Sequence, residues 1–316
     1  MDDRPPDHTD IDAAAGRIAG RVRRTPVLDL DPGALGLDHT VVLKLELLQH
    51  TGSFKPRGAF NRLLSAKESG ELTGQGIVAA SGGNHGLAAA YAARELGVPA
   101  RIFVPVTTPA AKLKKLRTLD ADVVQVGNEY AEAYQEALQA REVSGALLVH
   151  AYDQPEVVAG QGTVGLELLE QTRMFDTVLV AVGGGGLIAG IATAIGDNAQ
   201  VVAVEPALAP TLHRALEAGS PTDGAVGGVA ADSLGARRIG ELAFAAAQQY
   251  GVRSVLVDDE AIVAARNELW RDHHLATEHG GATAYAALTS GVYRPAAGER
   301  VVVVVCGANT DPSTLT

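Results

Sequence analysis

The sequence predicts an α/β protein built on a parallel sheet. Short runs rich in β-branched residues alternate along the chain with longer segments of helical periodicity. Several of the short runs are almost wholly apolar, as strands buried on both faces are, and such strands belong to parallel sheets covered by helices. Apolar residues make up 47% of the 316 residues, which is enough to fill a large core.

Each element follows from its local pattern. A helix is expected from a cap at Thr9 or Asp10 to about Val22. Strands are expected at residues 41–45, 77–80, 100–105, 122–126, 147–151, 177–182, 201–204, 254–257 and 301–305. Helices are expected between them, at residues 86–96, 111–118, 129–141, 161–172 and 259–274. The Gly- and Ala-rich stretch 218–231 predicts a loop.

Composition narrows the class of partner. The formal net charge of -11 and the absence of long Lys/Arg runs argue against nucleic-acid binding. Cys306 is the only cysteine, which excludes an intrachain disulfide and fits a reducing compartment. The first residues are polar and acidic, and no apolar run reaches membrane length. We therefore predict a soluble cytoplasmic protein that binds small molecules and neither nucleic acid nor membrane.

One lysine stands between a predicted turn and a predicted helix, in the run Thr51-Gly52-Ser53-Phe54-Lys55-Pro56-Arg57-Gly58-Ala59. Pro56 suits the first position of a helix, and its ring is expected to keep Lys55 out of helical conformation, as an N-cap. The positive end of the helix dipole there lowers the pKa of an ammonium, so the amine could form a Schiff base with a carbonyl. A solvated lysine at a helix start is the alternative.

The run Gly183-Gly184-Gly185-Gly186 follows an apolar strand and opens an apolar helix. Backbone N–H groups without covering side chains, beside a helix N-terminus, suit a phosphate. The same run satisfies a dinucleotide fingerprint, and Glu205 lies at the distance expected of a ribose-binding acid. An NAD-dependent oxidoreductase using Gly184, Gly186 and Glu205 is therefore an open alternative, as is a plain strand-to-helix turn.

Two further motifs fall at the carboxyl ends of predicted strands, where open α/β sheets bind ligands. The first is Ser81-Gly82-Gly83-Asn84-His85-Gly86, whose backbone could hold a substrate carboxylate. The second is Cys306, whose thiol is either a small buried apolar group or a contact to a ligand.

Together these motifs resemble, in the same chain order, those of the fold type II pyridoxal-phosphate enzymes, the tryptophan synthase β-like group that includes the serine and threonine dehydratases. The fourth motif of the set is Cys306-Gly307-Ala308-Asn309. The resemblance covers most of the chain. It implies two open, twisted, mainly parallel sheets flanked by helices, with a small domain at residues 74–151. The large cofactor-binding domain would then comprise residues 1–73 and 152–316.

The resemblance also implies roles for single residues. Lys55 would be the catalytic residue, in a Schiff base with pyridoxal 5'-phosphate, which Phe54, Asn84, Cys306 and the glycines Gly183, Gly184, Gly185 and Gly186 would contact. Asn84 would face the phenolic oxygen of the cofactor, and Cys306 its pyridine nitrogen. The implied substrate-binding residues are Ser81, Gly82, Asn84 and His85.

The resemblance does not assign a clear role to two acidic residues, Glu205 and Glu278. Some relatives bind a structural cation at the position of Glu205, but Thr211 stands where their second ligand, an aspartate, would be. Glu278 falls in a family segment near the cofactor ring, but His279 replaces the usual proline, which leaves the role of Glu278 open.

The activity implied is that of a homodimeric dehydratase, or ammonia-lyase, which removes water from L-threonine or L-serine to give a 2-oxo acid and ammonia. Serine racemase, hydroxyaspartate dehydratase and a cofactor-binding module without turnover are alternatives within the same resemblance. In the eukaryotic serine racemases a serine supplies a second acid on the opposite face of the cofactor. Gly82 occupies that place here, so dehydration is expected rather than racemisation.

Overall fold

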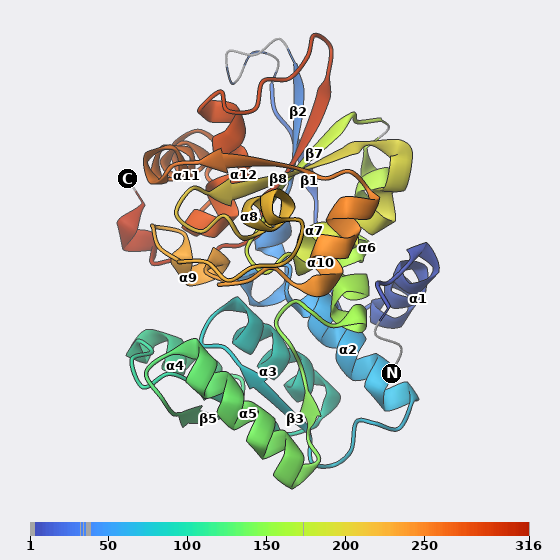
Figure 1. The fold of residues 1–316 in the computed structure, drawn as a ribbon, viewed down its shortest axis with the longest axis vertical. Helices are drawn as coiled ribbons and strands as arrows, with labels where there is room; N and C mark the ends of the chain where they lie inside the picture. Colours follow the sequence, from blue (N-terminus) through green and yellow to red (C-terminus); the bar gives the residue numbers. More distant parts are fainter. Residues whose placement is uncertain (1–3, 32, 34, 36–38, 173, 316) are drawn as a thin grey trace.

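The computed structural model describes residues 4–31, 33, 35, 39–172 and 174–315, and it contains two sheets, one in each lobe of Figure 1. The six-stranded sheet has the order β1 (Val27–Asp29), β2 (Thr40–Lys44), β10 (Arg300–Val304), β7 (Thr177–Ala181), β8 (Gln200–Pro206), β9 (Arg253–Val257). The four-stranded sheet has the order β5 (Asp122–Gln125), β4 (Ala100–Val104), β3 (Ile77–Ala80), β6 (Leu147–Leu148). Every pairing is parallel except that of β1 with β2, which confirms the predicted fold class.

One predicted strand is shorter than expected, and one strand was not predicted. The strand predicted at residues 147–151 ends at Leu148, because the chain leaves the four-stranded sheet there and crosses to the other lobe. In this crossover the His150 N–H donates to the side chain of Gln154 rather than to a neighbouring strand. The short edge strand β1 was not predicted, since three residues give no readable alternation.

Helices cover both sheets: α1 (His8–Ile18), α2 (Pro56–Glu68), α3 (Asn84–Leu96), α4 (Ala110–Arg117), α5 (Tyr130–Ser144), α6 (Pro155–Gln171), α7 (Gly186–Ile195), α8 (Thr211–Ala218), α9 (Ala231–Leu234), α10 (Glu241–Gln249), α11 (Asp259–His273) and α12 (His279–Thr289). Four of the five helices predicted between strands agree closely in position. The fifth, α6, begins at Pro155, before the predicted start, because a proline suits the first position of a helix.

The first helix also differs from its prediction at both ends. Asp7, not Thr9 or Asp10, is the N-cap: its side chain accepts from the Asp10 N–H, while the Asp10 side chain accepts from the Asp7 N–H. This reciprocal capping box fixes the start of α1. The helix ends at Ile18 rather than at Val22, because the chain turns at Gly20 in a left-handed conformation.

The core has separate parts under the two sheets. The largest apolar cluster packs α6, α7, α10 and α12 against the six-stranded sheet, and two smaller clusters pack α3 and α5 against the four-stranded sheet. Ser81, Gly183 and Cys306 follow directly, or within two residues, the carboxyl ends of β3, β7 and β10. The sheets thus present all three predicted motifs at strand ends.

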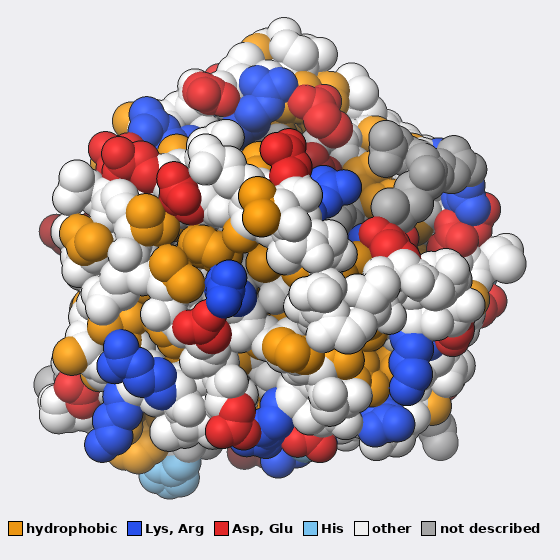
Figure 2. Space-filling view, turned by 90° about the horizontal axis from the view of Figure 1, so that it is seen from below, with side chains coloured by type: hydrophobic (Ala, Val, Ile, Leu, Met, Phe, Trp, Pro, Cys, Tyr) orange, Lys and Arg blue, Asp and Glu red, His pale blue; other side chains and the backbone are white. Residues whose placement is uncertain are grey.

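The surface carries both signs of charge. Figure 2 shows acidic and basic side chains interspersed on the face seen from the four-stranded-sheet end of the molecule. Arg101 and Asp122 on neighbouring strands form one of the exposed ion pairs of the molecule. Among the described residues, no helix combines the length and apolar character that a membrane span requires.

Candidate active site

Lys55 lies at the start of α2 with its amine turned toward the crossover between the lobes. Its Nζ donates a hydrogen bond of 2.6 Å to the carbonyl oxygen of Ala151 and stands 5.0 Å from the centre of the Phe54 ring. Burial lowers the pKa of Lys55 to about 8, although Cys306 and Glu278 act in the opposite direction. The lowered pKa makes the neutral, nucleophilic amine much more accessible near neutral pH than that of an ordinary lysine. The lowered pKa of Lys55 is therefore caused by burial, whereas the helix dipole was the cause expected from the sequence.

The backbone of Lys55 corrects one prediction. Lys55 is the N-cap and Pro56 the first helical residue, but Lys55 has φ -54° and ψ -33°, which is helical. The segment before it is fixed by tertiary contacts: Ser53 forms a β-bridge with Gly307, and the Phe54 N–H donates to the Cys306 carbonyl. These contacts override the local preference of a residue before proline.

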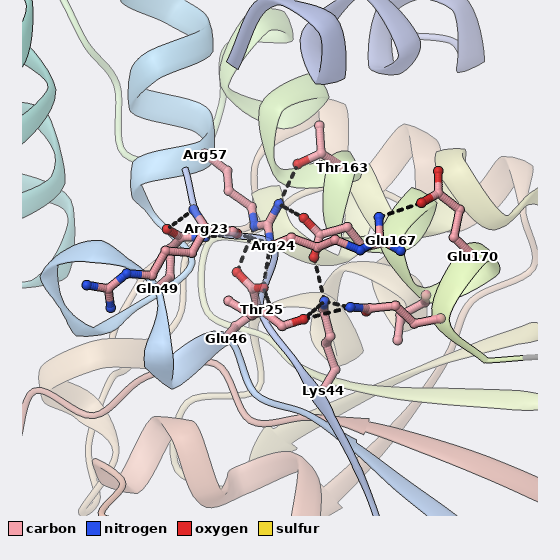
Figure 3. Close-up of polar contacts among 12 residues, drawn as sticks. Arg23, Arg24, Thr25, Lys44, Glu46, Gln49, Arg57, Thr163, Glu167 and Glu170 are labelled. Carbon is pink, nitrogen blue, oxygen red and sulfur yellow. Dashed lines mark hydrogen bonds and ion pairs between the residues drawn. The ribbon is translucent and has the colours of Figure 1, made fainter. Parts of the chain in front are cut away.

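A buried ion network holds the first turn of α2 in place (Figure 3). The Arg57 guanidinium bonds both oxygens of Glu46, at 2.8 and 2.7 Å, and one oxygen of Glu167 at 2.7 Å. The Lys44 ammonium bonds the other Glu167 oxygen at 2.5 Å and Gln171 at 2.7 Å. Two cations thus balance two carboxylates. This network was not predicted from the sequence, although Lys44 and Glu46 stand out as charges in an otherwise apolar segment.

The glycine run forms a cradle at the N-terminus of α7. Gly185 is the N-cap, with a φ of 90° that favours glycine. A Cβ at Gly184 would lie 2.2 Å from the Tyr152 ring, so only glycine fits there. In the described part of the chain, no acceptor receives a hydrogen bond from the N–H groups of residues 184–188. Free N–H groups at a helix N-terminus are what an anionic phosphate requires.

The Asn84 side chain joins the start of α3 to the segments that carry Glu278 and Asn309. Asn84 is the first residue of α3; its Nδ2 donates to Glu278 and its Oδ1 accepts from Asn309 Nδ2, each at 2.7 Å. Asn309 also donates to the Thr51 carbonyl. Burial raises the pKa of Glu278 to about 7, so this carboxyl changes charge near neutral pH. The sequence left the role of Glu278 open; the structure places it against Asn84.

Two side chains of the Ser81–His85 motif form hydrogen bonds within the protein. The Ser81 hydroxyl accepts from the Gly83 N–H at 3.1 Å. His85 donates from Nε2 to the Val149 carbonyl at 2.9 Å. Burial, followed by the charge of Lys55, lowers the pKa of His85 to about 3, so the ring is neutral. The side chain of His85 therefore anchors the crossover. Among the described residues, the N–H groups of Gly82, Asn84 and His85 have no acceptor and remain for a ligand.

Cys306 does not have the surroundings of a nucleophile. Its thiol is 3% exposed and donates to the Gly280 carbonyl at 3.6 Å. Burial raises the pKa of Cys306 to about 12, so the thiol stays protonated. The Cys306 carbonyl accepts from the N–H of Phe54, the residue before Lys55, so the backbone of this strand end adjoins the start of α2.

Glu205 does not have the surroundings expected of a ribose-binding acid. It is fully buried, and its two oxygens accept from the N–H groups of Leu212 and His213 and from the Ser254 hydroxyl. It therefore caps the N-terminus of α8 and has no oxygen directed to a ribose. Among the described residues, no group of three or more His, Cys, Asp or Glu side chains is placed to bind a metal ion.

The cavities near these residues are small. A space of about 40 Å³ adjoins Gly82, Asn84, Glu278, Lys112 and Asp232, and the last two form an ion pair across its edge. A larger pocket, about 590 Å³, lies between α1, α2, α5 and α6 and contains none of the predicted site residues.

The Lys55 amine bonds the carbonyl of Ala151, and the ring of the next residue, Tyr152, packs against Gly184 of the glycine run. A buried lysine of lowered pKa near free N–H groups at a helix N-terminus is the combination that an enzyme with a phosphorylated carbonyl cofactor needs. The family model described as "Pyridoxal-phosphate dependent enzyme" matches residues 18–307. The chain belongs to this family.

Individual relatives agree with that assignment. The chain is 38% identical over 311 residues to an L-threonine ammonia-lyase of Geobacter sulfurreducens, covering 98% of this chain and 77% of that protein. It is 37% identical over 311 residues to a phenylserine dehydratase of Ralstonia pickettii, covering 96% and 94%. Maize serine racemase superposes with a TM-score of 0.91 at 31% identity, covering 98% of this chain and 95% of that one.

Proposed function

We propose that the chain is a pyridoxal-phosphate-dependent dehydratase that converts L-threonine or L-serine to a 2-oxo acid and ammonia. The observation that carries the proposal is the buried Lys55 amine of lowered pKa, which bonds the Ala151 carbonyl beside Tyr152, the residue whose ring packs against Gly184 of the cradle. The similarity to an L-threonine ammonia-lyase over nearly the whole chain supports this activity.

The residues present fit the cofactor. The free N–H groups of residues 184–188 would bind its phosphate, and Lys55 would hold its carbonyl carbon as a Schiff base. Asn84 would orient the ring through its amide, with Phe54 beside it, and the protonated Cys306 would face the ring nitrogen. When bound, pyridoxal phosphate supplies an electron sink for the carbanion that proton loss leaves at Cα.

The chain's own groups would then move the proton and hold the substrate. The Lys55 amine, once displaced by the amino group of the substrate, would take the Cα proton, since an amine of pKa about 8 is a competent base near neutral pH. The N–H groups of Gly82, Asn84 and His85 would bind the substrate carboxylate at the start of α3, with Ser81 shaping the loop through its hydroxyl. The β-hydroxyl would gain a proton in exchange for the one taken from Cα and leave as water, and hydrolysis of the enamine by one water would give the 2-oxo acid and ammonia.

The nicotinamide alternative is disfavoured by the position of Glu205. Both oxygens of this carboxylate are used at the start of α8, so neither can bind a ribose hydroxyl. For the same reason the proposal needs no structural cation at Glu205.

The division into domains follows from the two sheets. We infer that residues 74–151, which contain the four-stranded sheet, form the small domain, and that residues 1–73 with 152–316 form the large one. The homodimer and the cytoplasmic location remain predictions, which sedimentation analysis and cell fractionation test.

The proposed activity is tested by 2-oxo acid release from L-threonine, L-serine and 3-hydroxyaspartate. We expect release from L-threonine or L-serine that requires added pyridoxal phosphate and no nicotinamide. Protein that binds the cofactor but releases no 2-oxo acid from any of the three would contradict the proposal.

A further inference from the structure

Asn309, the last residue of the Cys306-Gly307-Ala308-Asn309 motif, links two of the other motifs. Its Nδ2 donates one hydrogen bond to the carbonyl oxygen of Thr51 and one to Oδ1 of Asn84, each of 2.7 Å. Thr51 belongs to the turn before Lys55, and Asn84 begins α3. Asn309 thus connects the turn that carries the lysine to the asparagine that would face the phenolic oxygen of the cofactor.

The surroundings of Asn309 determine the orientation of its amide. A backbone carbonyl only accepts hydrogen bonds, so the end that bonds Thr51 is the NH2 group. At the other end, the Lys115 ammonium, which only donates, lies 3.5 Å from Oδ1. If the amide turned over, an oxygen would face the Thr51 carbonyl and an NH2 group would face the ammonium. Asn309 is therefore fixed in one orientation.

The second N–H of Asn309 orients Asn84 in turn. This N–H needs an acceptor, so the end of the Asn84 amide that meets it is Oδ1. The other end, Nδ2, then donates to Glu278 at 2.7 Å. An NH2 group carries two hydrogens, and Glu278 takes one of them. Among the described residues Asn84 Nδ2 has no second acceptor, so one N–H remains for a ligand.

The backbone of Thr51 supports a functional role for this arrangement. Its φ of 59° and ψ of 9° lie in the left-handed region, which a β-branched residue rarely adopts. Such strain persists only where surrounding contacts impose it, and it is concentrated at functional sites. The contacts here are the hydrogen bond from Asn309 to the Thr51 carbonyl and one of 2.8 Å from the Ala308 N–H to the Gly52 carbonyl.

The three side chains come from both lobes. Asn84 follows β3 of the four-stranded sheet, whereas Glu278 precedes α12 and Asn309 follows β10 in the other lobe. All three line the cavity of about 40 Å³ that adjoins Gly82. Asn84 is therefore held in this orientation only while the two lobes are in contact.

We propose that Asn309 is a positioning residue: together with Glu278, it holds Asn84 so that an N–H, and not the carbonyl, faces the phenolic oxygen of pyridoxal phosphate. This inference rests on the proposed role of Asn84. A donor stabilises an ionised oxygen more than a neutral hydroxyl, because the hydrogen bond to a charged acceptor is stronger. A carbonyl in the same place would favour the neutral hydroxyl. Asn309 thus keeps the phenolic oxygen ionised in the holoenzyme.

The absorbance spectrum of the holoenzyme tests the proposal, since an ionised phenolic oxygen gives a visible band and a protonated one a near-ultraviolet band. Asn309→Leu removes both N–H donors and lets the Asn84 amide turn. At equal cofactor content we expect the ratio of the visible to the near-ultraviolet band to fall roughly two- to tenfold. Asn198→Leu is the control, because this exposed asparagine also donates to a backbone carbonyl, that of Ile195, and should leave the ratio unchanged.

Two substitutions at Glu278 separate the orientation of Asn84 from a general loss of structure. Glu278→Gln keeps an acceptor for Asn84 and should keep the wild-type ratio, whereas Glu278→Leu should lower the ratio as Asn309→Leu does. The spectra are compared at pH 6. Burial raises the pKa of Glu278 to about 7, so its carboxyl is then mostly neutral and its charge does not enter the comparison.

Unfolding of the protein without cofactor gives a second readout. If Asn309 orients Asn84, the losses of stability in Asn309→Leu and Asn84→Leu should not add in the double variant, because the two substitutions remove the same hydrogen bond. Additive losses would overturn the inference, as would a wild-type absorbance ratio in Asn309→Leu and Glu278→Leu. A lowered ratio in these variants, with no 2-oxo acid released by the wild type, would support the positioning role and contradict the dehydratase function alone.

Discussion

Replacing Arg57 by methionine tests whether the buried ion network fixes the start of α2. The substitution removes five hydrogen bonds: two to Glu46 and one each to Glu167, the Thr163 hydroxyl and the Arg23 carbonyl. It leaves Glu46 fully buried with the Thr25 hydroxyl as its remaining hydrogen-bond partner. Removing one partner of a buried ion pair typically costs about 3–5 kcal/mol, because the other charge stays desolvated. We expect the free energy of unfolding to fall by that amount.

The assay is urea denaturation followed by circular dichroism, with two comparison variants. Arg57→Met combined with Glu46→Leu removes the stranded charge and should recover at least half of the loss. Arg101→Met breaks an exposed pair with Asp122 and should cost at most about 1 kcal/mol. A loss below about 1 kcal/mol in Arg57→Met, or no recovery in the double variant, would refute the reasoning.

The acid dependence of stability follows from the same network. Burial alone would raise the pKa of Glu46, but the Arg57 guanidinium lowers it below its usual value. A carboxyl with a lowered folded-state pKa stabilises the fold above its unfolded-state pKa, and this contribution is lost as the pH falls through the folded-state value. The Arg57→Met, Glu46→Leu double variant should lack this part of the acid-induced destabilisation.

Three further predictions concern the site. Gly184→Ala should weaken pyridoxal phosphate binding at least tenfold, because its Cβ would lie 2.2 Å from Tyr152, whereas Gly16→Ala, in open space, should not; equilibrium dialysis measures both. Burial raises the pKa of Glu278 to about 7, so the stability that its protonated form contributes is lost as the pH rises from about 4.5 to 7. Glu278→Gln should remove that part of the pH dependence of the melting temperature. Identical pH profiles of the variant and the wild type would contradict this. L-serine incubated in deuterium oxide should give pyruvate with little D-serine by chiral chromatography, because Gly82 carries no side chain to act as a second acid; D-serine forming as fast as pyruvate would sink this assignment.

The sheets were predictable because their signal is local. Residues such as Val301 and Val302 belong to runs that are apolar throughout, and burial on both faces of a parallel sheet leaves few other patterns. The helical conformation of Lys55 was not predictable, since it depends on Phe54 and Ser53 bonding to the segment after β10. A preference of one dipeptide is small compared with several tertiary hydrogen bonds.

Side-chain contacts between residues far apart in the sequence could not be predicted either. Asn84 and Glu278 are 194 positions apart, and nothing local indicates that their side chains meet. Glu205 had the spacing of a ribose-binding acid, but that spacing equally suits a residue that caps the next helix. The ring of Tyr134 in α5 packs edge to face on that of His150 in the crossover, a contact that forms only when the two segments fold together.

The central claim is that Lys55 carries the cofactor and the proton-transfer chemistry. Borohydride reduction of the holoenzyme, followed by digestion and mass spectrometry, locates the lysine to which pyridoxal phosphate is attached. We predict a reduced adduct on the peptide that contains Lys55, and neither adduct nor L-threonine turnover in Lys55→Ala. An adduct on another lysine, or near-normal turnover in Lys55→Ala, would contradict the account.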